Sequence, residues 1–317
     1  MPASRSASDA PVIFLLGPTA SGKTALALHL ANHFPVDIIS VDSALVYRGM
    51  NIGTAKPDAE ALTRYPHRLV NVIEPTESYS AARFCKDARA AIDEIMSAGR
   101  IPLLAGGTML YVKALLEGLS TMPPADAGVR AEIEAEAEAA GWPAMHRRLA
   151  QVDAVTARRL EPGDSQRIQR ALEVFRISGT PISTLQVRDR RMTDFPFRTL
   201  RIGLLPHDRA VLHQRIAARF DAMIEQGLVD ELRGLRKRYA LHPDMPSMRC
   251  VGYRQAWQFI DGEIDAKTLR ESGIAATRQL AKRQMTWLRS MEGMENFDCL
   301  RVDLAEAVTS RVKSFVT

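Results

Sequence analysis

The sequence has few cysteines and no long apolar run, and these two absences exclude several classes of protein. Cys85, Cys250 and Cys299 are too few for a disulfide framework and too far apart for a CxxC metal site, so we expect reduced thiols. The strongest apolar stretch, residues 12–16, is shorter than a membrane span or the core of a signal peptide. We therefore expect a cytoplasmic protein with no membrane partner.

The composition also excludes a chain that is mainly disordered. Of its 317 residues, 46% are hydrophobic and 25% are charged, which is close to the average of globular proteins. This length is about twice that of a common domain, so we expect one large α/β domain or a core with a second lobe. Residues 1–9, rich in Ser and Ala, are interpreted as a frayed tail.

Short β-branched runs alternate with helical patterns in the first third of the chain. Residues 12–16, 36–41 and 101–105 are typical of strands, and helical spacing follows the first and the second of them. This rhythm predicts an α/β fold with a parallel sheet flanked by helices. Asp42 and Thr108 follow two of these strands, and the carboxyl ends of parallel strands line a common crevice. We therefore expect both side chains to face one ligand site.

The composition changes near residue 121. From there to residue 192 the pattern is helical without a convincing strand, and a β run returns at residues 198–205. The sequence thus predicts a discontinuous catalytic core, residues 1–121 and 193–317, with an inserted all-helical lobe over residues 122–192.

A phosphate-binding motif, G-x-x-x-x-G-K-[ST], lies between the first strand and the helix that follows it. Its glycines allow backbone amides to converge on phosphate oxygens, its lysine supplies a positive charge, and its last hydroxyl suits Mg²⁺. The motif predicts a P-loop that binds a phosphate chain, without identifying a nucleotide. Its residues are Gly17, Pro18, Thr19, Ala20, Ser21, Gly22, Lys23 and Thr24.

Two further segments at the predicted crevice are open to more than one interpretation. Asp42 is compatible with a magnesium ligand, a general base or an ordinary N-cap. The segment Gly106-Gly107-Thr108 is compatible with a loop that approaches a ligand closely or with a plain strand-to-helix turn.

The net charge of +5 arises from 42 basic and 37 acidic residues, and it is unevenly distributed. Residues 147–191 hold ten arginines against five acidic residues, a local excess equal to that of the whole chain. On the helix predicted after residue 164, Arg167 and Arg170 diverge from an apolar face. That face consists of Ile168, Ala171, Leu172 and Phe175.

A second basic stripe, Arg278, Lys282 and Arg289, lies on a later helix with Trp287 nearby. One such stripe is usually a solvated face. Two of them favour a nucleic acid, because RNA is bound through backbone charge and aromatic stacking.

Seven segments, in order along residues 12–293, resemble the bacterial tRNA dimethylallyltransferase family, also called tRNA isopentenyltransferases. The segments are residues 17–24, 42–47, 53–57, 106–111, 166–173, 249–254 and 277–289. The resemblance implies transfer of a dimethylallyl group from dimethylallyl diphosphate to N6 of the adenosine immediately 3′ of the tRNA anticodon, with release of diphosphate.

The resemblance also implies roles for individual residues. Asp42 is the general base on the adenine amine, Thr108 positions that amine, and Arg219 reaches the diphosphate. Mg²⁺ is the expected cofactor, held at Thr24, and we expect a monomer. Contact with the anticodon stem-loop of tRNA is implied for Asp42, Ser43, Ala44, Leu45, Arg130, Gln166, Arg167, Ile168, Gln169, Arg170, Arg249, Cys250, Val251, Gly252, Tyr253, Arg254, Lys282, Arg283, Gln284, Met285, Thr286, Trp287, Leu288 and Arg289.

Two departures and two alternatives accompany this interpretation. Many relatives carry Gln where this chain has Ala44, and the Cys/His set of the zinc-finger extension found in some longer members has no match. One alternative is a small-molecule or nucleoside kinase with ATP in the P-loop, which requires an adenine site and an arginine-bearing lid. The other is a non-catalytic RNA-binding module, which the intact Lys23, Thr24 and Asp42 disfavour.

Overall fold

The computed structural model describes residues 10–118, 122–188 and 195–317. The chain forms two compact units: unit 1 is Met1–Lys113 with Pro196–Thr317, and unit 2 is Ala114–Phe195. The predicted lobe falls within the bounds of unit 2. The predicted tail, the arginines at 190 and 191, and the domain boundaries at residues 121 and 192 lie outside the described residues.

Unit 1 is built on a parallel sheet of six strands in the order β3-β2-β4-β1-β5-β6. The strands are β1 (Pro11–Leu16), β2 (Val36–Val41), β3 (His67–Arg68), β4 (Ile101–Gly106), β5 (Arg198–Leu205) and β6 (Glu295–Asp298). The central strand β1 has neighbours on both sides and is almost entirely buried, which explains its continuous apolar run. The predicted α/β fold with a parallel sheet is confirmed, and the edge strands β3 and β6 were not predicted.

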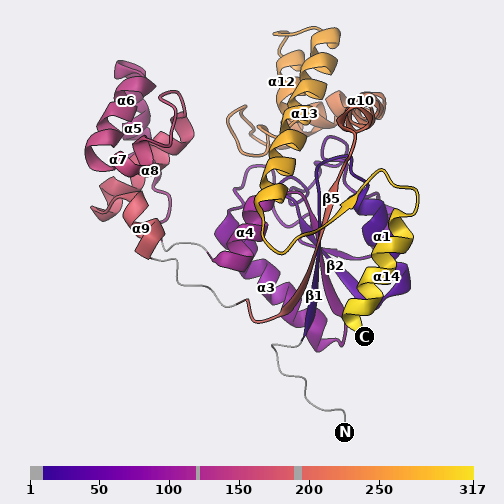
Figure 1. Cartoon of the computed structure of the whole chain (residues 1–317). Coiled ribbons are helices and arrows are strands. Elements are labelled where there is room, and N and C mark those ends of the chain that lie inside the picture. The colour runs from indigo at the N-terminus through magenta and orange to yellow at the C-terminus, as the bar shows by residue number, and fades with distance from the viewer. Residues whose placement is uncertain (1–9, 119–121, 189–194) are drawn as a thin grey trace. The chain divides into compact units, whose positions relative to one another are not determined.

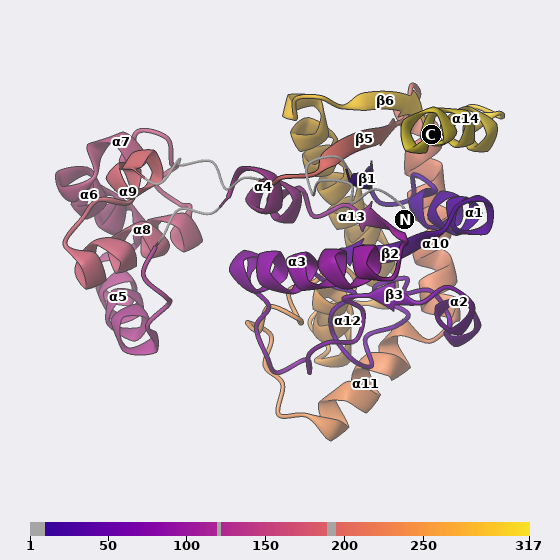
Figure 2. The same ribbon diagram turned by 90° about the horizontal axis from the view of Figure 1, so that it is seen from below.

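Helices cover both faces of this sheet (Figures 1 and 2). On one face, α1 (Lys23–His33) packs against α14 (Leu304–Val316), and the two share a core cluster with β1, β2 and β5. On the other face, α3 (Ala81–Ser97) packs against β2 and β4 with Phe84, Ala88 and Ile92 buried. The short α2 (Ala59–Arg64) precedes β3, and α4 (Met109–Glu117) follows β4.

Four helices lie above the carboxyl ends of the strands (Figure 1). They are α10 (Arg209–Glu225), α11 (Leu228–Arg238), α12 (Tyr253–Ile260) and α13 (Ala266–Ser290). The longest, α13, packs tightly on α10, because a side chain at Gly273 would come within 1.9 Å of the Phe220 ring. These four helices cover the carboxyl edge of the sheet, where the sequence predicts the ligand site.

Unit 2 is a bundle of short helices around its own core. The helices are α5 (Ala127–Ala140), α6 (Trp142–Val152), α7 (Ala154–Ala157), α8 (Ser165–Ser178) and α9 (Ile182–Arg188). In the predicted apolar face of α8, Ile168, Ala171 and Leu172 are buried as expected, whereas Phe175 is only half-buried. No strand occurs in the described part of this unit, in agreement with the predicted helical lobe.

Two expectations about the whole chain are also addressed by the structure. The three cysteines are free thiols, and Cys299 is buried. Among the described residues, no helix has the length and apolar character needed to cross a bilayer.

Candidate active site

A pocket of about 570 Å³ opens at the carboxyl edge of the sheet in unit 1. Its walls come from the P-loop, the segments that follow β2 and β4, and the helices α10 and α13. The sequence-predicted residues that line it are Thr19, Lys23, Thr24, Asp42, Ser43, Ala44, Leu45, Thr108, Arg219, Arg249, Cys250, Val251, Arg283, Gln284 and Trp287. The structure thus brings the predicted catalytic residues into one site.

The P-loop connects β1 to α1, as its motif predicts. Ala20 and Gly22 have left-handed backbone conformations, with φ of +63° and +86°, and Gly22 is the N-cap of α1. The first N–H groups of a helix have no acceptor within the helix, so they favour an anion in front of them. Lys23 reaches back across the loop, where its Nζ donates to the carbonyl of Pro18 at 2.8 Å.

Two half-buried cations line the pocket without a full set of partners among the described residues. Burial lowers the pKa of Lys23 to about 8; nearby Asp42 opposes this shift and Arg219 adds to it. Burial also lowers the pKa of Arg219, again opposed by Asp42, and no described residue accepts a hydrogen bond from its guanidinium. Each charge is destabilised by desolvation, so an anionic ligand would stabilise both.

Asp42 uses its two carboxylate oxygens differently. Its Oδ1 accepts hydrogen bonds from the backbone N–H of Ala44 at 2.8 Å and of Leu45 at 3.4 Å, which stabilises a turn; no helix begins here, so Asp42 is not an N-cap. No described residue donates a hydrogen bond to Oδ2. Ser43 N–H donates to Oγ1 of Thr108 at 3.0 Å, so the turn after β2 is tied to the residue after β4. The predicted proximity of Asp42 and Thr108 is confirmed, and one carboxylate oxygen remains available to a substrate.

Several residues of the predicted RNA-contacting segments do not present their side chains to solvent. In α13, Met285 and Leu288 are buried in the core, because helical periodicity turns every third or fourth position inward. Tyr253 and Ile168 are fully buried for the same reason, and Gly252 is buried beside Tyr253. These four side chains are therefore not accessible to RNA in this structure, and Gly252 has no side chain to offer. The predicted contact of the five positions with tRNA stays a prediction.

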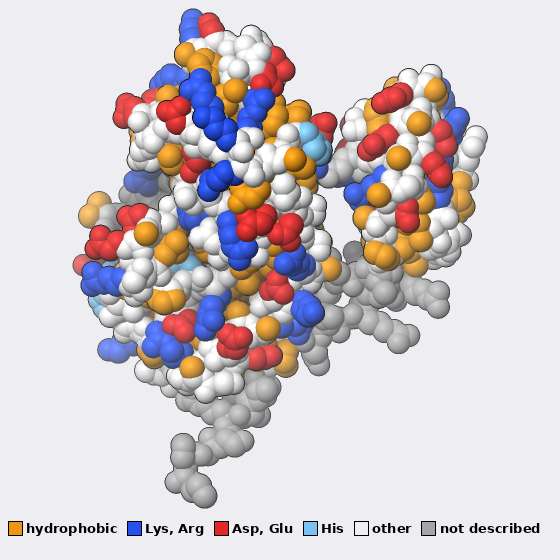
Figure 3. Space-filling view, turned by 180° about the vertical axis from the view of Figure 1, so that it is seen from behind, with side chains coloured by type: hydrophobic (Ala, Val, Ile, Leu, Met, Phe, Trp, Pro, Cys, Tyr) orange, Lys and Arg blue, Asp and Glu red, His pale blue; other side chains and the backbone are white. Residues whose placement is uncertain are grey.

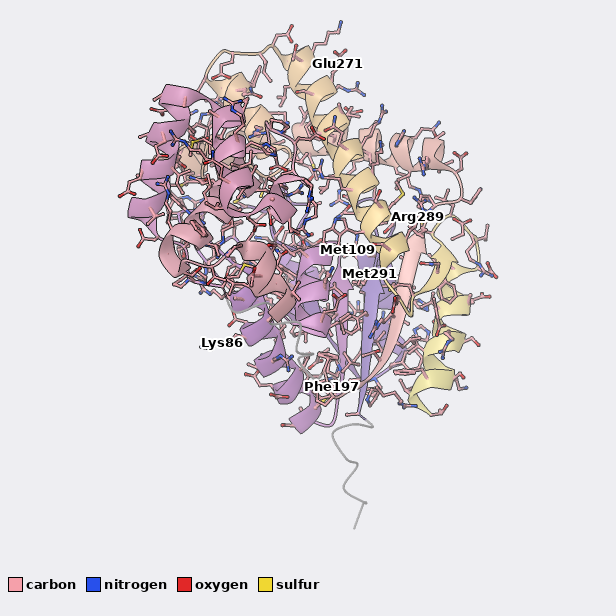
Figure 4. The ribbon with its side chains drawn as sticks, turned by 60° about the vertical axis from the view of Figure 1, so that its left-hand side comes forward. Lys86, Met109, Phe197, Glu271, Arg289 and Met291 are labelled. Atoms are coloured by element: carbon pink, nitrogen blue, oxygen red, sulfur yellow. The ribbon has the colours of Figure 1, made fainter. Side chains whose placement is uncertain are left out.

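The exposed members of the same segments form the accessible basic surface. They are Arg249, Arg254, Lys282, Arg283, Thr286, Trp287 and Arg289. Lys113 of α4 lies over the Trp287 ring at 5.9 Å from its centroid, which joins the end of α13 to α4. Figure 4 shows this end of α13, marked by Arg289, next to the start of α4, marked by Met109. On the face of unit 1 that is seen from behind in Figure 3, Lys and Arg side chains gather in the upper part.

In unit 2, the predicted arginines are organised by a carboxylate that the sequence reasoning did not single out. Glu173 on α8 is fully buried and accepts hydrogen bonds from Arg130 at 2.9 Å, Arg170 at 2.7 Å and the N–H of Asp126 at 2.9 Å. Burial raises the pKa of Glu173, but the hydrogen bonds from the two arginines outweigh it and leave the pKa lowered. The other polar residues at the start of α8 do not donate to the Glu173 carboxylate. Gln166 is exposed, Gln169 donates to Glu134 at 2.8 Å, and Arg167 pairs with Asp164.

Some lining residues were not predicted, and four of them bear on the chemistry. Ile216, Phe220 and Met223 line the apolar part of the pocket from α10, and their i, i+4, i+7 spacing marks one helical face. That periodicity was a usable signal. Ser40 on β2 lines the pocket with a buried hydroxyl that has no partner, and nothing in the sequence distinguishes it.

The residues present fit a magnesium ion that is held mainly by a ligand. Thr24 lines the pocket with an exposed side chain that carries a hydroxyl. No cluster of three or more His, Cys, Asp or Glu side chains suited to a metal occurs in the described residues. Mg²⁺ commonly binds through one or two protein oxygens together with substrate phosphates, so this donor set is sufficient.

Comparison with known proteins places this site in a family. A family model described as IPP transferase matches residues 45–291. The chain belongs to the IPP transferase family. A tRNA dimethylallyltransferase of Dechloromonas aromatica is 56% identical to it over 97% of this chain and 98% of the relative.

Two solved structures resemble this IPP transferase over most of its length. The tRNA isopentenylpyrophosphate transferase of Bacillus halodurans is 34% identical, with a TM-score of 0.70, and the match covers 97% of both chains. A eukaryotic dimethylallyltransferase, solved acting on tRNA, is 25% identical, with a TM-score of 0.79, and the match covers 97% of this chain and 80% of that one. The resemblance drawn from the sequence is therefore confirmed, and the family is one of transferases, not of kinases or non-catalytic RNA-binding modules.

Proposed function

We propose that this enzyme transfers a dimethylallyl group from dimethylallyl diphosphate to N6 of the adenosine immediately 3′ of the anticodon in tRNA, releasing diphosphate. One observation carries the proposal. The Oδ2 atom of Asp42, to which no described residue donates, belongs to the same pocket as the two incompletely paired cations Lys23 and Arg219. A proton acceptor and an anion site in one pocket are what this reaction requires.

The chemistry follows from these groups. The N6 nitrogen forms a bond to C1 of the dimethylallyl group while the C1–O bond to diphosphate breaks, and the N6 proton passes to Asp42. An exocyclic amine is a poor nucleophile, so a carboxylate that accepts its proton lowers one barrier. Lys23, Arg219 and the P-loop amides stabilise the negative charge of the leaving diphosphate and lower the other.

We assign the remaining roles from the same pocket. Thr108 positions the amine, and Thr24 would hold Mg²⁺, which when bound neutralises part of the diphosphate charge. The apolar face of α10, Ile216, Phe220 and Met223, suits the five-carbon tail. The adenosine must leave its stack to reach Asp42, as bases do in other enzymes that modify them.

Contact with tRNA is assigned to the exposed cations and aromatics. In unit 1 these include Arg249, Arg283 and Trp287, which line the pocket and are exposed. In unit 2, Arg130, Arg167 and Arg170 supply positive charge near or at the surface. The chain is proposed to act as a monomer, which light scattering of the purified protein tests.

The activity is tested by following two labels. The enzyme is supplied with dimethylallyl diphosphate labelled in the prenyl group, or with ATP labelled in its terminal phosphate, with and without unmodified tRNA. We expect prenyl label on the tRNA, abolished when the adenosine 3′ of the anticodon is replaced by guanosine. Phosphoryl transfer from ATP that is faster than prenyl transfer would overturn the proposal.

A further inference from the structure

Gln284 of α13 joins two loops of the active site through its carboxamide. Its Oε1 accepts a hydrogen bond from the backbone N–H of Thr19 at 2.8 Å, and its Nε2 donates to the backbone carbonyl of Gly107 at 3.0 Å. Thr19 belongs to the P-loop and Gly107 to the loop after β4. These partners lie 265 and 177 residues from Gln284 along the chain, so the bridge exists only in the folded protein.

Gln284 accepts one of these hydrogen bonds and donates the other, so its side chain must carry both an acceptor and a donor. The backbone N–H requires an acceptor and the carbonyl requires a donor, so the orientation of the amide follows from its partners. An ionised glutamate offers no donor to Gly107. A methionine keeps the volume and offers neither bond.

The backbone leaves space for this bridge at one glycine. A Cβ atom at position 107 would lie 2.3 Å from Nε2 of Gln284, so a side chain there would push the carboxamide away from its observed place. Gly107 therefore permits the carboxamide to reach its carbonyl. This accounts for the second glycine of the Gly106-Gly107-Thr108 segment, which the sequence left open between a ligand loop and a plain turn.

The bridge continues from the P-loop to the residues proposed to act on the amine. Gly107 precedes Thr108, and the N–H groups of both donate to the carbonyl of Val41 at 3.1 Å. Thr108 in turn accepts from Ser43, the residue after Asp42. A continuous path of hydrogen bonds and peptide units thus runs from the phosphate-binding loop, through Gln284, to Thr108 and Asp42.

We propose that Gln284 is a positioning residue that sets the separation between the diphosphate-binding loop and the groups that orient and deprotonate the amine. The inference rests on the proposed function and replaces the expectation that Gln284 contacts tRNA. Its neighbours Arg283 and Trp287 are exposed, whereas both polar atoms of its own side chain are already bonded within unit 1. Misplacement of reacting groups by about 1 Å costs on the order of 10²-fold in rate, so such a bridge acts on the chemical step.

The test compares Gln284→Met with Gln279→Met. Gln279 lies on the same helix, is exposed, and has no hydrogen-bond partner among the described residues, so it controls for the change of residue type. The single-turnover rate of prenyl transfer is measured with both substrates bound, together with the Kd values for tRNA and for inorganic diphosphate. We expect Gln284→Met to lower the rate about 10–100-fold, with the Kd for tRNA within about twofold of wild type. Gln279→Met changes neither quantity.

A second variant keeps the test decisive if Gln284→Met unfolds. Gln284→Glu retains the acceptor for Thr19 and loses the donor to Gly107, so its rate is also expected to fall. A wild-type rate in either folded variant would overturn the inference, as would a large rise in the Kd for tRNA with an unchanged rate in the bound complex. Failure of the proposed function gives a different result, because wild type itself would then transfer no prenyl group.

Discussion

The cations of the pocket and the buried carboxylates of unit 2 differ in how fully the protein satisfies their charge. In unit 1, the half-buried Lys23 and Arg219 have pKa values lowered by burial, and the described residues do not fill their hydrogen-bonding capacity. In unit 2, Glu173 and Asp153 are buried carboxylates with several donors each; Asp153 accepts from both the N–H and the hydroxyl of Thr156 and of Ser183.

The pKa values record this difference. Burial raises the pKa of Asp153, as it does for Glu173, but hydrogen bonds outweigh burial and leave both pKa values below their ordinary range. A buried charge that the protein satisfies completely stabilises the fold, whereas one left incomplete marks where a ligand supplies the missing partner. The fully paired carboxylates therefore have a structural role, and the incompletely paired cations mark a binding site.

Removing the proton acceptor from the incomplete site gives the largest expected effect. Asp42→Ala is expected to lower kcat by about 10²–10⁴-fold, the usual contribution of a general base. Asp42→Asn keeps an oxygen for the N–H of Ala44 and so preserves the turn, yet it is expected to be equally slow. Single-turnover assays with saturating tRNA measure this. Near-normal turnover of Asp42→Ala with a collapsed tRNA affinity would assign Asp42 to binding.

Removing one incomplete cation is the next largest change. Lys23→Met is expected to weaken binding of inorganic diphosphate by about 10–100-fold, since hydrogen bonds to charged groups are worth about 1.5–3 kcal/mol. The pKa of Lys23 is lowered to about 8, so in the free enzyme its charge is present below that pH and is lost as the pH rises through it. The advantage of wild type over Lys23→Met should therefore shrink above about pH 8 in calorimetric titrations. A constant ratio from pH 7 to 9 would contradict this role of the charge.

The satisfied carboxylate of unit 2 should affect stability and leave the chemistry intact. Glu173→Gln is expected to lower the free energy of unfolding by about 1–3 kcal/mol at pH 7. The pKa of Glu173 is lowered in the folded state, so its contribution is present above the ordinary value of 4.5 and is lost as the pH falls through the folded pKa. Urea unfolding of the full chain at several pH values measures the difference from wild type, which should vanish in acid. Glu134→Gln, an exposed control in the same unit, should stay within about 0.5 kcal/mol of wild type.

The arginines held by unit 2 give the smallest effect. Arg167→Ala with Arg170→Ala is expected to reduce the slope of log K for tRNA against log salt by about 0.7–0.9 for each phosphate that the variant no longer neutralises. Arg167, with 74% of its side chain exposed, should contribute more than Arg170, which is bonded to Glu173. Filter binding at several salt concentrations measures the slopes. Arg301→Ala, whose guanidinium pairs with Asp303, serves as the control. An unchanged slope in the double variant would leave these arginines with a purely structural role.

The sequence predicted the parts of the fold that have a local signal. The strands β2 and β5 were placed at their observed bounds because they are six and eight residues long and rich in Val, Ile and Leu. The edge strand β6 is only four residues of mixed polarity, ENFD, and β3 is two residues long, so neither carries a periodic pattern.

The residues of the candidate site also divide into those that the sequence could predict and those that it could not. Asp42 and Thr108 could be paired in advance, because topology brings the ends of adjacent parallel strands together. The partners of Gln284 could not be predicted, since they are set by packing between distant segments. Glu173 was counted only as one of the acidic residues among the arginines, because a charged residue on a predicted helix gives no sign that it points inward.

The order in which the chain is synthesised gives the packing of α1 against α14 a further meaning. Leu26 and Leu30 of the phosphate-binding helix share a buried cluster with Val312 and Phe315 of the last helix. At about 5–20 residues per second, a ribosome needs roughly 15–60 s to produce this chain, and α14 emerges long after β1, β2 and β4, the strands on which α1 packs. A chain interrupted before residue 304 therefore carries an intact phosphate-binding motif on a helix that packs on the sheet but lacks its neighbour α14, so Leu26 and Leu30 lose part of their cover.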